Sequence, residues 1–171
     1  MNTVRVSNLK LNLEALMHGH TLKIQKTHPN AKFTRAHEDD AGLDLYTVED
    51  FELEPNERFK VDLGIAVALP PGTVGLVFPR SGLSLEEGIT LANSVGVIDA
   101  GFRGELKAAV HNIGSYAYVP AGTRIVQMLV QPVIVPALEV VDDLDETARG
   151  DAGFGSSGGY EKITAEKIWI E

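Results

Sequence analysis

The sequence contains no cysteine among its 171 residues. This absence excludes disulfide bonds, thiolate nucleophiles and cysteine-based zinc sites, and it fits the cytoplasmic location that we expect. It also excludes the Pro-Cys-x-x-Cys element of a zinc deaminase. The five histidines contain no His-Glu-x-x-His, so the sequence does not indicate a histidine-based zinc site either.

Positive charge is also scarce, because 15 basic residues face 24 acidic ones and the formal net charge is −9. Such a surface repels phosphate backbones, so we do not expect nucleic-acid binding. A nucleotide triphosphate would need local arginines or a divalent cation to overcome the same repulsion. Arginines in glycine-rich loops and carboxylates that could serve a metal are therefore the candidate residues for such a site.

Long apolar runs are missing as well: none approaches the roughly 18 residues of a membrane span. The N-terminal ten residues lack the apolar stretch of a secretory signal. Apolar residues make up 44% of the chain and charged residues 23%, which is typical of a soluble globular protein. We expect one main domain with a hydrophobic core and no contact with a membrane.

Period-two hydrophobicity is the clearest structural signal. Residues 59–69 alternate apolar with small or polar side chains, which predicts a half-buried strand, bent at Gly64. Further strand-like segments, separated by Pro, Gly and Asn, are residues 22–26, 73–78, 106–111 and 124–135. Short helices are indicated only before Gly19 and at residues 81–87. Many short strands with turns between them predict an all-β sandwich, jelly roll or barrel.

Two short stretches carry polar groups at strand positions. Asp44 lies between two leucines, where it faces solvent or a site. Arg80, Ser81 and Gly82 follow a strand directly. They form either an ordinary turn or a loop tip that offers a guanidinium, a hydroxyl and an accessible backbone N–H to phosphate.

Three other stretches allow two interpretations each. Residues 96–102 read as strand, turn, strand, and Asp99 is either a turn residue or a general base that acts on a water. Gln127 lies inside an apolar strand, as a hydrogen-bonded core amide or as a ligand to a substrate. Residues 149–158 are glycine-rich, as a linker or as a phosphate-binding loop, although they lack a Walker A sequence.

Together, these stretches resemble the trimeric dUTPase family, which carries five ordered motifs. They stand here at residues 41–45, 79–83, 93–104, 122–127 and 149–158, and the resemblance covers roughly residues 21–159. It implies a distorted jelly-roll β-barrel with a flexible glycine-rich C-terminal arm. It also implies a homotrimer whose active sites are shared between subunits.

The resemblance further implies a reaction: hydrolysis of dUTP to dUMP and pyrophosphate, assisted by Mg²⁺. This reaction limits uracil in DNA and supplies dUMP for dTMP synthesis. Mg²⁺ would be bound mainly by the phosphates, with Asp44 acting on it through a water molecule. The implied catalytic residues are Asp99, Gln127 and Arg80. Asp99 would activate the water that attacks the α-phosphorus.

The resemblance assigns substrate contacts from all parts of the chain. Uracil would be read largely through backbone groups of the hairpin 97–102 and by Asn93, with Lys107 on the far strand of that hairpin near the ligand. The arm would clamp the γ-phosphate and stack an aromatic ring on the base. The residues implied to bind substrate are Arg80, Ser81, Gly82, Asn93, Val97, Ile98, Asp99, Phe102, Lys107, Gln127, Arg149, Phe154, Gly155 and Ser156.

The chain departs from the family pattern in three places. Phe102 stands where a tyrosine usually packs under the deoxyribose. Residues 1–20 and 160–171 extend the chain at both ends and are candidates for binding a protein partner. We therefore expect four parts: an N-terminal extension (1–20), a β-barrel core (21–141), a linker with the arm (142–159) and a C-terminal extension (160–171).

Two other functions stay open. A dCTP deaminase shares the implied fold and resembles the chain around residues 98–102, but its catalytic glutamate lies three residues before the asparagine that closes the hairpin. Here that asparagine is Asn112 and the position holds Ala109. A trimeric binding module with a regulatory partner is the second alternative, against which the complete set of motifs argues.

Overall fold

The chain folds into antiparallel β-structure, as a computed structural model shows for residues 21–153. Residues 1–20 and 154–171, and with them the predicted helix before Gly19, lie outside the described residues. The only helix within residues 21–153 is the short α2 (Ser81–Glu86). No helix of this part is long and apolar enough to cross a membrane. The all-β prediction is therefore confirmed.

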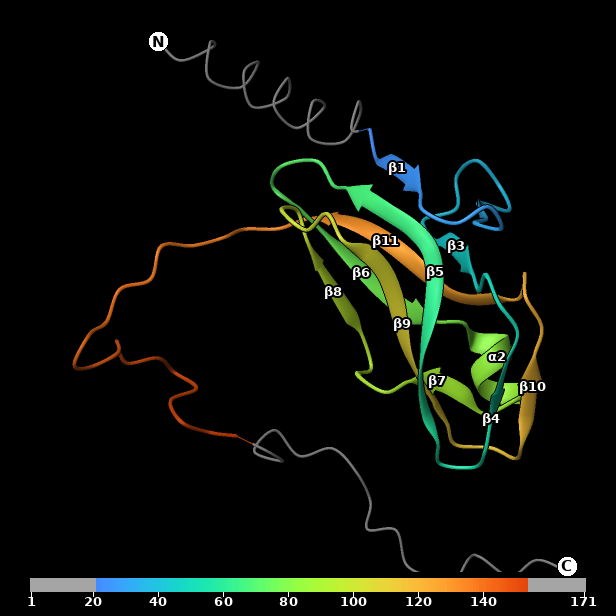
Figure 1. Cartoon of the computed structure of the whole chain (residues 1–171). Helices are drawn as coiled ribbons and strands as arrows, with labels where there is room; N and C mark the ends of the chain where they lie inside the picture. Colours follow the sequence, from blue (N-terminus) through green and yellow to red (C-terminus); the bar gives the residue numbers. More distant parts are fainter. Residues whose placement is uncertain (1–20, 154–171) are drawn as a thin grey trace, which may run out of the picture. The chain divides into compact units, whose positions relative to one another are not determined.

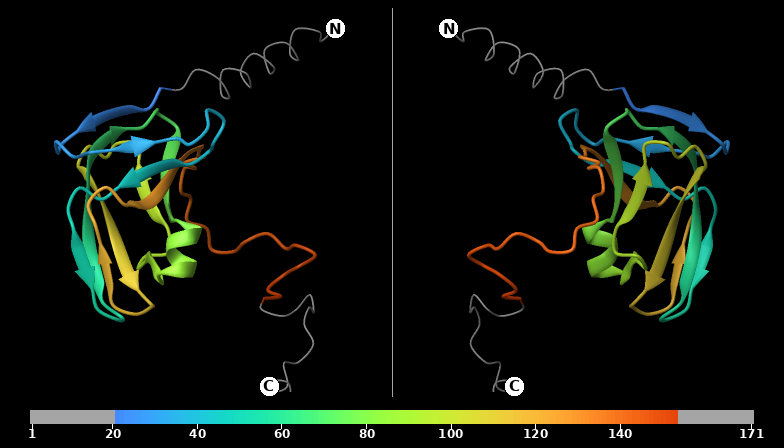
Figure 2. Two further views of the ribbon diagram at one scale, coloured as in Figure 1. Left: turned by 90° about the vertical axis from the view of Figure 1, so that its right-hand side faces the viewer. Right: turned by 90° about the vertical axis from the view of Figure 1, so that its left-hand side faces the viewer.

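Three antiparallel sheets make up the fold. The first orders β1 (Lys23–Lys26), β5 (Arg58–Ala68), β9 (Glu105–Asn112) and β7 (Ile89–Leu91), and the second pairs β10 (Ala117–Val119) with β4 (Phe51–Leu53). The third orders β2 (Phe33–Thr34), β3 (Leu43–Tyr46), β11 (Arg124–Pro132), β6 (Thr73–Pro79) and β8 (Gly96–Asp99). Figure 2 shows these sheets wrapping a common interior, with α2 on one side.

The core fills this interior with aliphatic side chains from both large sheets. Leu63, Ile65 and Leu106 come from the first sheet, and Leu45 and Met128 come from the third; all are almost fully buried. The predicted alternation explains this arrangement, because every second residue of a strand points to the same face. Asn112 is a polar residue in this interior: it is fully buried, and its amide donates to carbonyl groups of Leu53, Glu54 and Ser115.

The predicted strands mostly match the observed ones, but two differ. The predicted strand 124–135 ends at Pro132, because its partner β6 begins at Thr73 and the last backbone bond there runs from Val133 to the carbonyl of Gly72. Residues 136–153 belong to a separate unit of the chain and contain neither helix nor strand.

The predicted hairpin is also wrong in one respect. A turn does follow β8, closed by a bond from the Phe102 N–H to the Asp99 carbonyl (3.0 Å). However, β8 pairs with β6, whereas β9 pairs with β5 and β7. Both edges of β9 are therefore occupied, and the connection from β8 to β9 passes between two sheets instead of closing a two-stranded ladder (Figure 1).

Gly64 bends β5 where the sequence predicts a bend. Its φ is +64°, and the β5–β9 register is interrupted between Asp62 and Ala66. Its carbonyl accepts bonds from the N–H groups of Thr27 and His28. A Cβ on Gly64 would lie 2.6 Å from Val48 Cγ1 and 2.8 Å from His28 Cβ. Glycine is thus required here by both conformation and space.

We expect Gly64→Ala to destabilise the barrel more than Gly72→Ala. Gly72 also has a positive φ, +74°, but a Cβ there would meet nothing within 4 Å. Both variants bear the left-handed penalty, about 1–2 kcal/mol. Only Gly64→Ala adds overpacking, about 1–3 kcal/mol. Urea unfolding of the two variants measures the difference in unfolding free energy, and equal losses would contradict the packing argument.

Candidate active site

A cluster of polar side chains lies where β3, β11 and β6 run side by side. Gln127 on β11 is opposite Asp44 on β3 and opposite Phe78 on β6. Arg80 follows Pro79, the last residue of β6, and precedes α2. The first, second and fourth motifs, far apart in sequence, therefore meet in one chain because β11 is the central strand of this sheet.

Asp44 is held between two arginines. Its Oδ1 lies 3.0 Å from Arg80 Nε, and its Oδ2 lies 3.3 Å from Arg124 Nη1. The Asp44 side chain is only 13% exposed, against 29% for Arg80 and 45% for Arg124. Because Asp40 lines the same pocket, the two guanidinium groups there face two carboxylates and the formal charges balance. The pocket is thus locally neutral in a chain of net charge −9, and its two guanidinium groups can bind the oxygens of a triphosphate.

The cluster lines a pocket of about 270 Å³. Its wall also includes the loop before β3, with Asp40, Ala41 and Gly42. Gln127 donates its amide to the carbonyl of Pro79 at 3.1 Å. A Cβ on Gly42 would come within 2.8 Å of Gln127 Oε1, so glycine lets the loop pass close to this amide. Gln127 thus combines the two predicted possibilities: it is hydrogen-bonded within the fold and also faces the pocket.

The residues that follow Arg80 are accessible. Ser81 and Gly82 open α2 and are exposed, and a Cβ on Gly82 would meet no atom within 4 Å. The first turn is closed by the Ser84 N–H, which donates to the Arg80 carbonyl. The predicted helix at 81–87 is confirmed in position. The second motif therefore presents its hydroxyl and its backbone outward beside the arginine cluster.

The third motif lies elsewhere on the sheet. Asp99 ends β8 opposite Val74, near the start of β6, and is exposed. Ile98 packs against the core, whereas Val97 points outward with 63% exposure. Asn93 is exposed in the turn before β8. Phe102, 43% exposed, follows β8 in the link to β9.

The two parts of the predicted site are therefore separated within one chain. Asp99 pairs with Val74 of β6, and Arg80 stands six residues after Val74, directly beyond the end of that strand. At about 3.3 Å per residue, this separation is roughly 20 Å. A general base must be within hydrogen-bond reach of its water, directly or through one other water. Asp99 and the arginine cluster of the same chain do not meet that requirement together.

Lys107 lies on the barrel, whereas Arg149 belongs to the separate C-terminal unit. Lys107 is on β9, opposite Asp62 of β5, and forms an ion pair with that carboxylate. The hydrogen bond to Asp62 raises the pKa of the Lys107 ammonium above its usual value. Arg149 lies in the separate unit, where its Nε donates to the Ala152 carbonyl at 3.2 Å. Phe154, Gly155 and Ser156 lie outside the described residues.

Arg124 is a site residue to which sequence reasoning assigned no role. It opens β11 next to an irregularity in register and reaches Asp44, eighty positions away in sequence. The only signal was its place in the fourth motif, three residues before Gln127. Its partner could not be recognised without the strand register.

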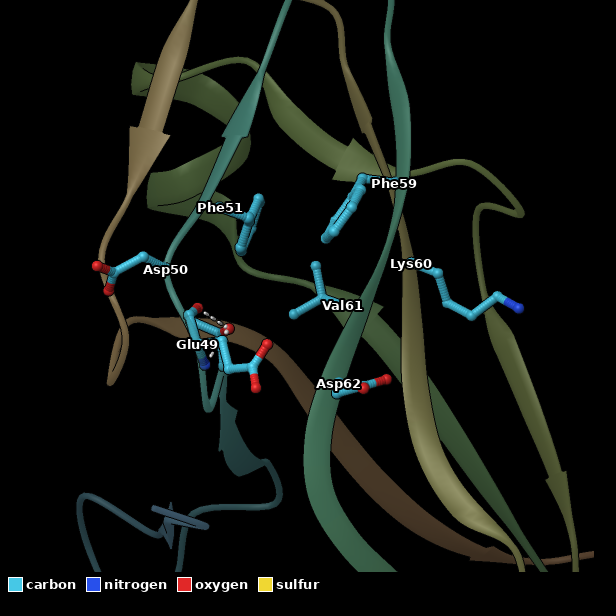
Figure 3. Close-up of a pocket in the computed structure, with 8 residues that line it drawn as sticks. Glu49, Asp50, Phe51, Phe59, Lys60, Val61 and Asp62 are labelled. Atoms are coloured by element: carbon cyan, nitrogen blue, oxygen red, sulfur yellow. Dashed lines mark hydrogen bonds between the residues drawn. The ribbon is translucent and has the colours of Figure 1, made fainter. Parts of the chain in front are cut away.

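A second pocket lies between β4 and β5 and has a different character. Figure 3 shows the rings of Phe51 and Phe59 facing each other above Val61; their centroids are 5.3 Å apart. Its volume is about 80 Å³, and none of its lining residues belongs to a motif. It has less than a third of the volume of the pocket beside Asp44, so it is the poorer candidate for a nucleotide site.

Known proteins resemble this chain in both sequence and fold. A sequence model of the dUTPase family matches residues 29–158. The deoxyuridine 5'-triphosphate nucleotidohydrolase of Nocardia farcinica is 50% identical over 133 residues, covering 77% of this chain and 81% of the relative. The enzyme of the same name from Mycobacterium bovis is 48% identical over 151 residues, covering 84% of this chain and 98% of the relative.

Solved structures agree. The dUTPase of Staphylococcus bacteriophage 80alpha, solved with dUpNHpp, superposes with a TM-score of 0.76 at 30% identity, covering 81% of this chain and 99% of that chain. A mutant dUTPase from phage phi11 of S. aureus, described for its structural Mg(II) ion, has a TM-score of 0.68 at 26% identity, covering 72% and 97%. The antiparallel sheets are therefore the predicted jelly roll. This chain belongs to the dUTPase family and is a hydrolase that acts on dUTP.

Proposed function

We propose that the chain hydrolyses dUTP to dUMP and pyrophosphate by attack of water on the α-phosphorus, with help from Mg²⁺. This reaction limits the uracil that enters DNA and supplies dUMP for dTMP synthesis. The observation that carries the proposal is the arginine cluster around Asp44, which brings two guanidinium groups to one pocket in a chain of net charge −9. It is supported by the phage 80alpha dUTPase, which was solved with a dUTP analogue.

The proposed roles follow from position. Arg80, Ser81 and Gly82 hold phosphate oxygens, because they are accessible beside the cluster. Gln127, anchored by Pro79, orients the phosphates and the attacking water. Arg124 and Asp44 fix the direction of the Arg80 guanidinium. Phosphoryl transfer depends largely on such positioning and charge stabilisation.

Asp99 completes the reaction. It takes the proton of the attacking water as the water oxygen bonds to the α-phosphorus, and the bond from that phosphorus to the bridging oxygen breaks to release pyrophosphate. An ordinary aspartate is a weak base, with a pKa of about 3.9, so orientation of the water contributes strongly. Val97 and Ile98 carry the base-reading backbone beside it, with Asn93 at the other end of β8. Lys107 and the arm residues Arg149, Phe154, Gly155 and Ser156 complete the substrate contacts.

The donor set fits a Mg²⁺ ion carried mainly by the substrate. The pocket offers the carboxylates of Asp40 and Asp44, which suit waters bound to the ion. No group of three or more acidic or histidine side chains is arranged as a metal cage within residues 21–153. When bound, Mg²⁺ neutralises and orients the phosphates. Asp44 would contact it through water, while its two arginines keep its carboxylate in place.

We further propose that the chain acts as a homotrimer with sites shared between subunits. The support is the roughly 20 Å along β6 that separates Asp99 from Arg80 in one chain. A neighbouring copy that places its β8 edge beside the arginine cluster closes this gap. The C-terminal arm of one subunit would cover the active site of a neighbouring subunit in the same trimer. Exchange of chain ends between identical subunits costs little.

An assay against all four dNTPs, measuring both pyrophosphate and ammonia, tests this function. We expect pyrophosphate from dUTP, and neither ammonia nor appreciable pyrophosphate from dCTP. The dCTP deaminase alternative is not favoured, because Ala109, which stands where its glutamate would, offers no acid or base on β9. Ammonia released from dCTP would overturn the assignment.

We expect Phe102 to exclude ribonucleotides with its ring face. UTP should be a much poorer substrate than dUTP, because a 2′-hydroxyl has no room against the ring. Phe102→Ala should relax this preference, whereas Phe102→Tyr, which keeps the ring, should retain it. The measurement is the ratio of kcat/KM for dUTP to that for UTP. An equal ratio in all three proteins would show that the ring of residue 102 does not exclude ribonucleotides.

A further inference from the structure

The backbone that carries Phe102 is held at several points. The Phe102 N–H donates to the Asp99 carbonyl at 3.0 Å. Arg103 Nη1 donates to the carbonyls of Ala100 and Phe102, each at 2.7 Å. One guanidinium nitrogen thus ties together both sides of the turn. The next strand, β9, begins at Glu105, which pairs with Ala66.

Gly104 lies between this turn and β9, directly against the ring of Phe102. A Cβ on Gly104 would lie 2.6 Å from Phe102 Cζ, 3.1 Å from Cε2 and 3.4 Å from Cε1. Carbon atoms normally approach to about 3.5–4.0 Å. Gly104 is not among the residues with a positive φ, so alanine fits its backbone conformation. The three atoms nearest to such a Cβ all belong to the ring, so the ring is what an alanine at this position would displace.

We infer that Gly104 is a positioning residue for sugar selectivity: by lacking a Cβ, it sets where the Phe102 ring lies. The inference rests on the proposed function, in which this ring packs under the deoxyribose. Because Arg103 and β9 hold the backbone, an added methyl group moves the ring and not the chain. The ring can yield, since Phe102 is 43% exposed and Cζ is its outer end.

Replacing Gly104 with alanine should therefore change selectivity while leaving the fold intact. We expect the dUTP-to-UTP ratio of kcat/KM to fall by about tenfold, the lower end of what a misfitted apolar contact contributes to discrimination. The loss should appear mainly in KM for dUTP, with kcat much less affected. The melting temperature should stay close to that of the parent protein.

Gly101→Ala is the matched control. Gly101 is in the same turn, but a Cβ there would meet nothing within 4 Å, and its φ is not positive. It adds the same methyl group to the same segment without touching the ring. Gly101 belongs to the segment that reads uracil, a base that dUTP and UTP share, so any effect on base binding cancels in the ratio, and we expect the dUTP-to-UTP ratio of the parent protein. If stiffening of the turn were the cause, both alanine variants would change the dUTP-to-UTP ratio alike, and the inference would be overturned.

A double-mutant cycle decides whether the effect passes through the ring. In the Phe102→Ala background the methyl group of Gly104→Ala has no ring to displace, so the ratio should be that of Phe102→Ala alone. The double variant also removes the clash. It should therefore fold as well as Phe102→Ala even if Gly104→Ala alone does not fold.

The outcomes distinguish the role of Phe102 in sugar selectivity from the role of Gly104 in positioning the Phe102 ring. If Phe102→Ala changes the ratio and Gly104→Ala does not, the ring is the gate but Gly104 does not position it. If Phe102→Ala leaves the ratio unchanged, the proposed gate itself is wrong and the inference falls with it. Additive effects of the two substitutions would also overturn it, because Gly104 would then act by another route.

Discussion

Replacing Asp99 with asparagine is expected to lower kcat by on the order of 10²–10⁴, the usual contribution of a general base. Asparagine keeps the shape of the side chain but cannot accept the proton of the attacking water. Asp99 is exposed at the end of β8 and makes no hydrogen bond through its side chain within the described residues. The fold should therefore tolerate the change, and the loss should be catalytic.

Binding should survive in Asp99→Asn. Calorimetric titration with dUpNHpp, the analogue bound to the phage 80alpha enzyme, should give a Kd within a few-fold of the parent value. Glu49→Gln is the control for loss of one negative charge, because Glu49 lines the small pocket between β4 and β5. Parent turnover in Asp99→Asn would contradict the assignment. Loss of binding as large as the loss of kcat would make Asp99 a binding residue.

Truncation after Thr147 is expected to reduce turnover by on the order of 10³, because arginine contacts to a transferring phosphate contribute about that much or more. The truncation removes Arg149 together with Phe154 and Ser156. The described strands all end by Pro132, so the barrel should fold without this segment. Chemistry at the barrel would then proceed without the clamp on the γ-phosphate.

Mixing this truncated chain with Asp99→Asn should restore part of the activity. In co-expressed mixed trimers, a subunit with intact Asp99 can meet an arm donated by a neighbour. Separately assembled homotrimers, combined without subunit exchange, are the control and should stay inactive. If mixed trimers, verified by native mass spectrometry, recover nothing, each arm serves its own subunit and the shared-site proposal fails.

Local patterns in the sequence predicted local structure well. The alternation at residues 59–69 matches β5, Gly64 bends it with a positive φ, and the second motif runs into α2 as expected. These features depend on neighbours in sequence. Side-chain period and backbone conformation are set within a few residues, so a single sequence carries them.

Features that depend on strand pairing could not be predicted. The alternation cannot tell which sheet a strand joins, so the sequence predicts β8 and β9 as one hairpin although they pair with different strands. The ion pair of Arg124 with Asp44 and that of Lys107 with Asp62 cross between strands distant in sequence. Both follow from register, which is fixed only when the whole core is assembled.

In the candidate site, too, the residue types could be predicted from the sequence but the distances between strands could not. The motifs predicted the residue types at the phosphate-binding cluster, and the structure places Asp44, Arg80 and Gln127 together. The motifs gave no indication that Asp99 lies roughly 20 Å away along β6, since spacing in sequence carries no distance between strand ends.

Hydrolysis of dUTP in H₂¹⁸O, followed by mass spectrometry of both products, tests the central claim most directly. If water attacks the α-phosphorus, a single ¹⁸O atom should appear in the phosphate of dUMP and none in pyrophosphate. The label should appear at the same position, but far more slowly, with Asp99→Asn. Label in pyrophosphate instead would place the attack on the β-phosphorus, and the proposed alignment of water, Asp99 and arginine cluster would be wrong.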